Sequence, residues 1–374
     1  MESRLRAFAH RHRLPAKRLV TGLVRVLPGS AGRRLRALAE QVAFRVRPEY
    51  QGDTLPPIFH FWSGRFLHPV LQDHGIGSPE SFYLQKILGT QAAGPILRVV
   101  SYGAGSCALE LDIAEALRDR GVAFEMTCVD FNEAQLQRAS AGAASRGLLP
   151  AVRFLAADCN AIADPPAADV ILVNQFFHHV EDLESFTAAL RGSLATEGRI
   201  LSCDVVGRNG HVPWPSVARE VDRAWSRLPP AKRFDRYHGR ATDRYIPVDH
   251  SSYSNEGVRA QDVVERLLEH FDFEVFLTFG AAVMPFIERR IGFNFDPECD
   301  EDRDFIREVQ QADAEALASH RYPASNMIAS IRHKGMAPEP VFFPVSPEAH
   351  SALTKREAGM LGHGRRGDRR IRAA

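Results

Sequence analysis

The order of short β-forming runs and helical segments constrains the fold of this chain more than any other feature of its sequence. Five runs rich in β-forming residues follow one another at residues 97–102, 124–130, 152–156, 170–174 and 199–205. Between the first three, apolar residues recur at every third or fourth position, which is typical of the buried face of a helix. This order predicts parallel βαβ units with right-handed crossovers, and hence an α/β fold.

The C-terminal half of the chain continues the same pattern with two interruptions. Two more strands are predicted at residues 273–279 and 326–332, with an amphipathic helix between them at residues 300–318. The first interruption, rich in tryptophan and proline, is expected to cover a site, and the second separates the last two strands. The expected α/β domain spans residues 94–335, with insertions at about residues 207–257 and 280–324.

Three segments outside this domain have their own composition. Residues 1–50 alternate basic and apolar positions with a helical period, so we expect a basic, helical N-terminal extension. Residues 51–93 predict a helical lead-in that helps to cover the site, and it contains a helix that begins after Ser78 with Pro79 in its first turn. Residues 336–374 are polar and rich in arginine, and they predict a flexible basic tail.

The first predicted strand runs directly into a glycine-rich turn. After Tyr102 the sequence reads Gly-Ala-Gly-Ser-Cys-Ala from Gly103 onward, and a helix follows. Glycines let the backbone pass close to a ligand, and the first N–H groups of a helix have no partner within the helix. Asp130 ends the second strand and Asp158 follows the third, so the three features lie at strand ends, where an open α/β sheet binds its ligand. A carboxylate such as Asp130 is suited to accept hydrogen bonds from the hydroxyls of a ribose.

In this turn, in the two aspartates and in the segment Asn-Gln-Phe-Phe-His-His-Val after the fourth strand, the sequence resembles the class I S-adenosylmethionine-dependent methyltransferases over residues 97–332. The resemblance implies a Rossmann-like, seven-stranded, mostly parallel sheet that ends in an antiparallel hairpin. Residues 204–211 and 255–262 look like an uncharacterised bacterial subgroup of the family. The resemblance implies S-adenosylmethionine as the cofactor, bound by Tyr102, Gly103, Ala104, Gly105, Asp130, Phe131, Asp158, Cys159, Asn174 and Gln175.

Two positions depart from the pattern of that family. Ser101 stands where the family often has an acidic residue, and Cys107 stands where it often has a third glycine. Both lie beside the glycine turn, at the end that receives the amino acid part of the cofactor in the family.

The activity implied by the resemblance is transfer of a methyl group by in-line displacement to an acceptor that we expect to be a small molecule. The cofactor already activates the methyl group, so the protein must mainly align the acceptor. An acceptor that arrives protonated also needs a base, and histidine is the most common one. His178 and His179 follow the fourth strand, while His211 and His250 lie in the covering segment. We take His178, His179 and His211 as candidate catalytic residues.

Composition and charge indicate an ordinary globular protein, but they do not indicate a binding partner. The chain has 374 residues, a formal net charge of +1 and 45% hydrophobic residues, as ordinary globular proteins do. No apolar run is long enough to span a bilayer, and the five cysteines show no spacing typical of zinc sites or disulfides, so we expect a cytoplasmic protein without a metal. Arginines crowd both ends of the chain, but few aromatic residues accompany them, so a nucleic acid partner is not favoured.

Two alternatives fit parts of the same sequence. A nicotinamide-dependent oxidoreductase can use the same glycine turn, but Asp158, the closing pair of strands and the lack of a Tyr-x-x-x-Lys pair speak against it. A scaffold that binds a cofactor or RNA without catalysis would use the basic ends of the chain. The sequence gives no indication of an oligomeric state.

Overall fold

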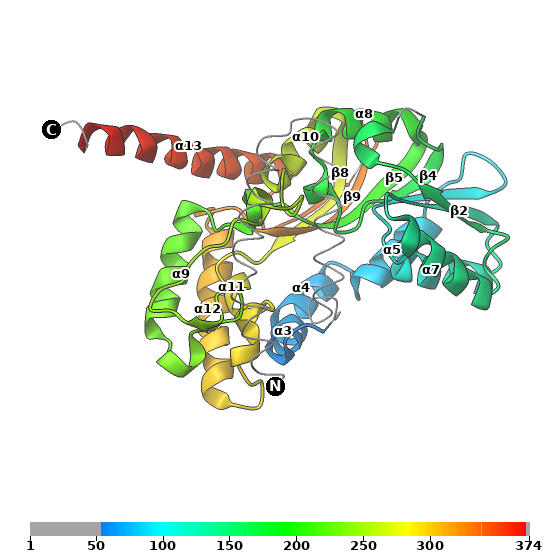
Figure 1. Ribbon diagram of the computed structural model, residues 1–374. Coiled ribbons are helices and arrows are strands. Elements are labelled where there is room, and N and C mark those ends of the chain that lie inside the picture. Colours follow the sequence, from blue (N-terminus) through cyan, green and yellow to red (C-terminus); the bar gives the residue numbers. More distant parts are fainter. Residues whose placement is uncertain (1–53, 163, 338, 372–374) are drawn as a thin grey trace.

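The computed structural model describes residues 54–162, 164–337 and 339–371, of which residues 362–371 are described by their backbone only. The predicted basic extension, residues 1–50, lies outside the described residues. Figure 1 shows that the described part consists of an α/β unit and a group of helices beside it. In this part, no helix has both the length and the apolar character needed to cross a membrane.

An eight-stranded sheet forms the centre of the α/β unit and confirms the predicted fold class. The strand order is β10-β8-β9-β5-β4-β1-β2-β3. Neighbouring strands run parallel except where β9 pairs with β5 and β8, so the predicted antiparallel hairpin is present. The strands are β1 (Leu97–Tyr102), β2 (Phe124–Asp130), β3 (Val152–Ala156), β4 (Ala168–Leu172), β5 (Leu194–Val205), β8 (Phe271–Phe279), β9 (Asn326–His333) and β10 (Val341–Phe343).

Helices cover both faces of the sheet, as Figure 1 shows. One face packs on α5 (Pro79–Leu88), α6 (Ala108–Asp119) and α7 (Glu133–Ser145), and the other on α8 (Leu183–Ser193) and α10 (Val263–His270). Each helix of the first group presents an apolar stripe to the strands, for example Leu111 of α6 and Leu136 of α7. Ser78 caps α5 by accepting a hydrogen bond from the N–H of Ser81, as the sequence predicts.

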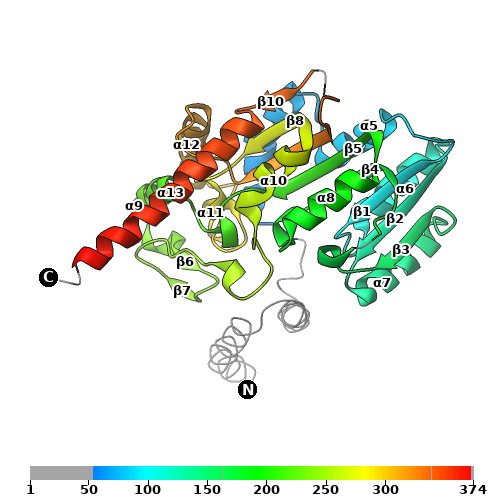
Figure 2. The same cartoon turned by 90° about the horizontal axis from the view of Figure 1, so that it is seen from above.

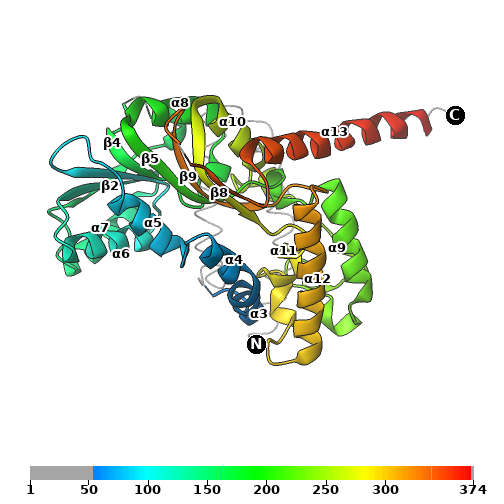
Figure 3. The ribbon, with the colours of Figure 1, turned by 180° about the vertical axis from the view of Figure 1, so that it is seen from behind.

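A second group of helices, which we call the cap, has a hydrophobic core of its own. It consists of α3 (Pro57–Trp62), α9 (Pro215–Arg227), α11 (Met284–Ile287) and α12 (Asp300–Ala318). Figure 3 shows these four helices beside one another, next to the β8–β9 side of the sheet. Trp62, Trp214 and Trp225 are almost fully buried in this core. The cap therefore joins the lead-in segment to the two predicted insertions, which lie far apart in the sequence.

The C-terminal segment differs from the flexible tail that its composition predicts. It adds β10 as an eighth strand beside β8 and then forms the long helix α13 (Pro347–Ile371). Figure 2 shows α13 crossing α10 and α9, with which it is in contact. The physical reason is a buried face within the polar sequence, since His350, Leu353 and Glu357 recur at helical spacing and are all buried.

Candidate active site

The glycine turn lies where the sequence predicts it, between the end of β1 and the start of α6. Gly103 and Gly105 have positive φ angles of +69° and +54°, which side-chain-bearing residues adopt at a cost. Cys107 precedes α6 with φ of 55°, and its side chain does not cap the helix. This side chain therefore accepts no hydrogen bond from the first N–H groups of α6. The turn therefore presents backbone donors at the carboxyl edge of the sheet.

Asp130 joins this turn to the turn after β2. One oxygen of its carboxylate accepts a hydrogen bond from the N–H of Gly105 at 2.9 Å, and the other accepts one from the N–H of Asn132 at 2.8 Å. Burial raises the pKa of Asp130, although these backbone donors oppose the rise. Each oxygen retains a further lone pair, so the carboxylate can still accept a hydroxyl of a ligand.

The turn after β3 is tied to the turn after β4 through Asn160. Asp158 accepts a hydrogen bond from the N–H of Asn160 at 2.9 Å, and the side-chain oxygen of Asn160 accepts the N–H groups of Glu181 and Asp182. Cys159, next to Asp158, has a buried side chain. The sequence therefore orders three neighbouring turns along one edge of the sheet.

The other predicted cofactor residues differ in which of their groups, ring, backbone or side-chain amide, are available to a ligand. Phe131, directly after β2, is 45% exposed, so one face of its ring is free for a planar partner. The ring of Tyr102 is buried against Phe186 of α8, which leaves its backbone to face the turn. Asn174 accepts a hydrogen bond from the hydroxyl of Tyr83 at 2.9 Å, and Gln175 donates one to the carbonyl of Cys203 at 3.1 Å.

Glu110 is a residue at this edge that sequence reasoning missed. It lies in the first turn of α6, is buried, and accepts a hydrogen bond from the hydroxyl of Ser101 at 2.7 Å. Burial raises the pKa of the Glu110 carboxyl. An acidic group thus lies beside Ser101 even though the strand itself carries none there. A charged residue on the apolar stripe of α6 is the signal that could have found it.

The three predicted histidines come together with Glu256, which the sequence analysis did not single out. Nδ1 of His178 lies 2.6 Å from a carboxylate oxygen of Asp204, at the end of β5, and its Nε2 lies 3.3 Å from Glu256. Nε2 of His211 is 3.1 Å from the same Glu256 oxygen, and Nε2 of His179 is 3.6 Å from the other one. We call these four residues, His178, His179, His211 and Glu256, the histidine cluster.

Charges in the histidine cluster shift the pKa values of its members in opposite directions. Burial alone would lower the pKa of His178, but Asp204 and Glu256 outweigh it and raise the pKa to about 10. Burial and the charge on His178 lower the pKa of His179 to about 4. For Glu256, burial is outweighed by His178 and His211, which hold the carboxyl pKa well below its usual range. The opposite charges of His178 and Glu256 thus lie beside the neutral imidazole of His179.

The covering segment holds His211 in an unusual backbone conformation. His211 has φ of 58°, next to Gly210 with φ of 68°. A side chain on Gly257 would approach within 2.5 Å of the His211 ring, so glycine is required there for the ring to lie where it does. His250 lies nearby, with its Nδ1 2.7 Å from the hydroxyl of Tyr253, and burial lowers its pKa to about 4.

Phe176 connects the glycine turn with the histidine cluster. A Cβ atom on Gly103 would lie 2.1 Å from the Phe176 ring, so the ring rests directly on the turn. The same ring stacks on His179 with centroids 6.3 Å apart, and the rings of His179 and His178 are 4.1 Å apart. One aromatic side chain therefore separates the predicted cofactor turn from the predicted catalytic histidines.

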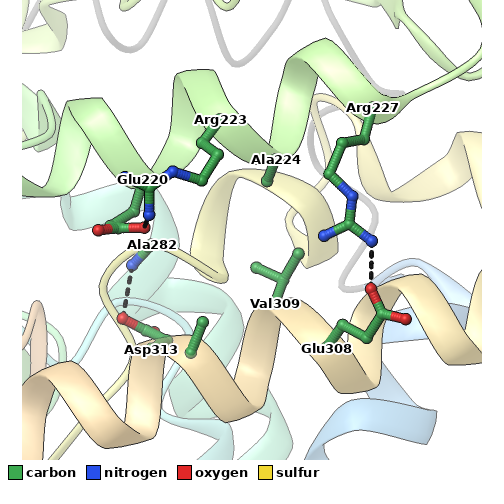
Figure 4. Close-up of a pocket in the computed structure, with 9 residues that line it drawn as sticks. Glu220, Arg223, Ala224, Arg227, Ala282, Glu308, Val309 and Asp313 are labelled. Atoms are coloured by element: carbon green, nitrogen blue, oxygen red, sulfur yellow. Dashed lines mark hydrogen bonds and ion pairs between the residues drawn. The ribbon is translucent and has the colours of Figure 1, made fainter.

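A small cavity lies elsewhere, between α9 and α12 of the cap. Figure 4 shows Arg227 of α9 paired with Glu308 of α12 across it, and Asp313 bonded to the N–H of Ala282 beside it. Its volume is about 90 Å³, whereas pockets for small molecules span roughly 300 to 1,000 Å³. The cavity is therefore too small to be the acceptor site.

Comparisons with known proteins find a methyltransferase domain and distant structural neighbours. Residues 100–200 match the model of a methyltransferase domain. The O-methyltransferase from a trans-AT PKS multienzyme of Brevibacillus brevis, solved with S-adenosyl-L-homocysteine, is 14% identical over 75% of this chain and 77% of that chain, with a TM-score of 0.39. The cyclase SpnF is 16% identical over 70% and 81% of the two chains, with a TM-score of 0.38. A search of curated protein sequences finds no match.

The residues that match the methyltransferase model contain most of the predicted cofactor site. They run from within β1 to within β5 and include the glycine turn, Asp130, Asp158 and the first two histidines. The sheet around them has the predicted strand arrangement, including the antiparallel final pair. Residues 100–200 are accordingly similar to a methyltransferase domain, which supports S-adenosylmethionine as the cofactor.

Proposed function

We propose that the enzyme methylates a small molecule that binds between the glycine turn and the histidine cluster. The observation that carries this proposal is the position of Phe176, which contacts Gly103 on one side and stacks on His179 on the other. A methyl group presented from the turn would point across this ring toward the cluster. The acceptor would approach from the cluster side, with Phe176 as one wall of its site.

The cofactor residues are assigned by the groups that they offer. Backbone N–H groups of residues 103–105 would hold the methionine end of the cofactor, and Asp130 would accept the ribose hydroxyls. The exposed ring of Phe131 would stack on the adenine, while Asp158 and the N–H of Cys159 would bond its polar edge. Asn174 and Gln175 would line the path between the cofactor and the acceptor.

The histidine cluster would receive the proton of the acceptor. In the displacement, a lone pair of the acceptor attacks the methyl carbon, the carbon–sulfur bond breaks, and its electron pair stays on sulfur to give S-adenosylhomocysteine. Alignment of the two partners can contribute roughly 7 to 11 kcal/mol, and a positioned proton acceptor typically adds about a hundred- to ten-thousandfold. His211 and His179, whose side chains are 27% and 24% exposed, are the histidines of the cluster that an acceptor would reach.

Two measurements test this proposal. Calorimetric titration of the full chain should show binding of S-adenosylmethionine and S-adenosylhomocysteine but not of NADH, and labelled S-adenosylmethionine then allows a screen of small hydroxyl and amine acceptors. With an acceptor in hand, the variant His211→Ala should reduce kcat about a hundredfold or more, with cofactor affinity unchanged within about threefold. The matched control is His238→Ala, because His238 also pairs with a carboxylate, that of Asp235, but lies outside the cluster.

Two results would contradict the proposal. Binding of NADH alone would contradict the cofactor assignment. An unchanged kcat for both His211→Ala and Glu256→Gln would place the acceptor elsewhere, whatever the cofactor site does.

A further inference from the structure

We propose that His178, His211 and Glu256 bind one divalent transition-metal ion, such as Zn²⁺. One imidazole nitrogen from each histidine and one carboxylate oxygen lie within 4.8 Å of one another. Two histidines and a glutamate are a ligand set that catalytic zinc sites use. The spacing of cysteines and histidines in the sequence predicts no metal, but these three ligands come from separate segments of the chain.

The distances between the donor atoms match those around a shared ion. Nε2 of His178 and Nε2 of His211 lie 3.3 Å and 3.1 Å from the same oxygen of Glu256. Zinc bonds of about 2.0 to 2.2 Å in tetrahedral geometry place neighbouring ligand atoms about 3.3 Å apart. An ion bound by these atoms would therefore keep these two distances nearly unchanged.

The orientation of the His211 ring distinguishes a metal site from a simple ion pair with Glu256. Nε2 of His211 is buried and makes no hydrogen bond with the residues that the structure describes, although Glu256 lies 3.1 Å away. In a hydrogen-bonded pair, the N–H points at the oxygen. Metal ligands instead point at a common centre that lies between them. The His211 ring thus has the position but not the direction of a hydrogen-bond partner of Glu256.

Asp204 supplies the second layer that metal-binding histidines require. Its carboxylate accepts a hydrogen bond from Nδ1 of His178 at 2.6 Å, which fixes the ring and directs Nε2 toward Glu256. The other Asp204 oxygen accepts the N–H groups of Phe176 and Phe177, so the carboxylate itself is held rigidly. Such a carboxylate–histidine pair orients the ligand and raises its basicity.

The site keeps room for a fourth ligand. The side chains of Glu256 and His211 are 36% and 27% exposed, whereas structural zinc sites are closed. An acceptor hydroxyl bound to the ion would lose its proton more readily, because a Lewis acid stabilises the oxyanion, and the proton would pass to His179, the member of the cluster that is not a ligand. This role in catalysis rests on the proposed function, but the binding of the ion does not.

Metal binding can be measured without any activity. The full chain is freed of metal with a chelator and titrated with Co²⁺, whose visible absorption reports tetrahedral coordination, and Zn²⁺ is then added as a competitor. We expect one equivalent of Co²⁺ to bind and to be displaced by Zn²⁺. The variants His211→Ala and Glu256→Gln should bind at least about 100-fold more weakly, and Asp204→Asn about 10- to 100-fold more weakly. His238→Ala should bind as the wild type does.

Cofactor binding by the same samples separates the two proposals. Retained affinity for S-adenosylhomocysteine shows that a variant is folded, so a loss of Co²⁺ binding then supports the site. No Co²⁺ binding by the wild type, or equal binding by His211→Ala and Glu256→Gln, would overturn it. Stoichiometric Co²⁺ binding without cofactor binding would confirm the metal site and contradict the proposed function.

Discussion

The glycine turn, Asp130, Asp158 and Glu110, which we call the cofactor edge, lie beside the histidine cluster, yet the chain builds the two regions in different ways. The glycine turn, Asp130 and Asp158 each lie within a few residues of a strand end and follow one another in chain order. The histidine cluster instead joins residues from the end of β4 to two parts of the covering segment, with Asp204 of β5 behind them. Local sequence thus specifies the proposed cofactor side, whereas tertiary packing specifies the proposed acceptor side.

The two regions also differ in how their buried charges are stabilised. At the cofactor edge, Asp130 accepts backbone N–H groups and Glu110 accepts a hydroxyl, so neutral donors satisfy both acids. In the histidine cluster, carboxylates face imidazoles. Neutral donors do not gain or lose a proton near neutral pH, so they hold the two acids in one arrangement. Imidazoles, in contrast, can exchange a proton for another ligand. This difference suits a binding edge on one side and chemistry on the other.

The largest effect that would test the independence of the two regions is expected from Asp313 in the cap. Its buried carboxylate accepts the N–H groups of Ala281, Ala282 and Val283 and the hydroxyl of Tyr322. Replacement by alanine leaves four buried donors without an acceptor, each worth roughly 1 kcal/mol or more. We expect Asp313→Ala to lower the free energy of unfolding of the cap by about 3 to 5 kcal/mol, measured by urea unfolding and hydrogen exchange.

Hydrogen exchange also shows whether this loss stays within the cap. Amides of α11 and α12 should exchange faster while those of β1 and β2 keep their protection, and affinity for S-adenosylhomocysteine should change little. The variant Asp313→Asn, which keeps one oxygen, should show the smaller loss. Equally faster exchange in β1 and β2 would mean that the cap and the sheet unfold as one unit.

The next largest effect is expected at Asp130, on the cofactor side. Asp130→Ala removes the proposed ribose contact and also the acceptor that holds the Gly105 N–H in the turn. We expect affinity for S-adenosylhomocysteine to fall at least about 100-fold, or about 2.7 kcal/mol, with Co²⁺ binding unchanged. Calorimetric titration measures both ligands, and Asp112→Asn, on the exposed face of α6, serves as the control. Unchanged cofactor affinity would contradict the assignment of Asp130.

How far the sequence predicts each region follows from this difference in construction. The ends of β1, β2 and β3 lie at the predicted residues, because each is marked locally by a glycine, an aspartate or a polar turn. The mostly parallel sheet and its antiparallel final pair follow from the family resemblance, whereas the strand order comes from the structure. The sequence analysis placed β4 two residues too late, since the apolar run there continues past its end at Leu172.

The cap and the histidine cluster could not be predicted in the same way. Nothing local indicates that Trp62, Trp214 and Phe286 share one core, because they lie 72 to 224 positions apart in the sequence. In the sequence, only the neighbouring Gly257 indicates that Glu256 lies at a site. The reason for this glycine is apparent only in the structure, where the His211 ring lies against it. The buried face of α13 was a local signal, but the many polar and basic residues around it obscured its period.

A smaller effect is expected from Glu274 in β8. It should change the stability of the fold without changing ligand binding in either region. Its carboxylate accepts the hydroxyl of Ser330 and pairs with Arg199 and Lys86, which outweigh burial and lower its pKa to about 2. A lowered pKa stabilises the fold fully above pH 4.5, and this contribution is lost as the pH falls toward about 2. We expect Glu274→Gln to lower the free energy of unfolding by about 2 kcal/mol at pH 7.

The pH dependence of unfolding separates this charge effect from packing. The difference between wild type and Glu274→Gln should shrink as the pH falls from 4.5 toward 2, in thermal or urea unfolding followed over that range. A difference that stays constant with pH would show that Gln fits the site poorly, not that the charge matters. Cofactor and Co²⁺ affinities at pH 7 should be the same in both proteins.

The smallest effects are expected from two matched helix caps, one on each side of the comparison. Asn132 caps α7 beside the cofactor edge by accepting the N–H of Gln135, and Asp182 caps α8 after the histidine turn by accepting the N–H of Ser185. Each alanine variant should lose about 1 kcal/mol of stability, as is typical when a helix cap is replaced by alanine.

The effects of the two variants on ligand binding should differ, because the N–H of Asn132 is held by Asp130 whereas that of Asp182 is held by Asn160. Asn132→Ala should weaken S-adenosylhomocysteine binding a few-fold, and Asp182→Ala should weaken Co²⁺ binding instead. If each variant changed both affinities equally, the two regions would be coupled through the strand ends, and the local and the assembled parts of the site would have to be treated as one.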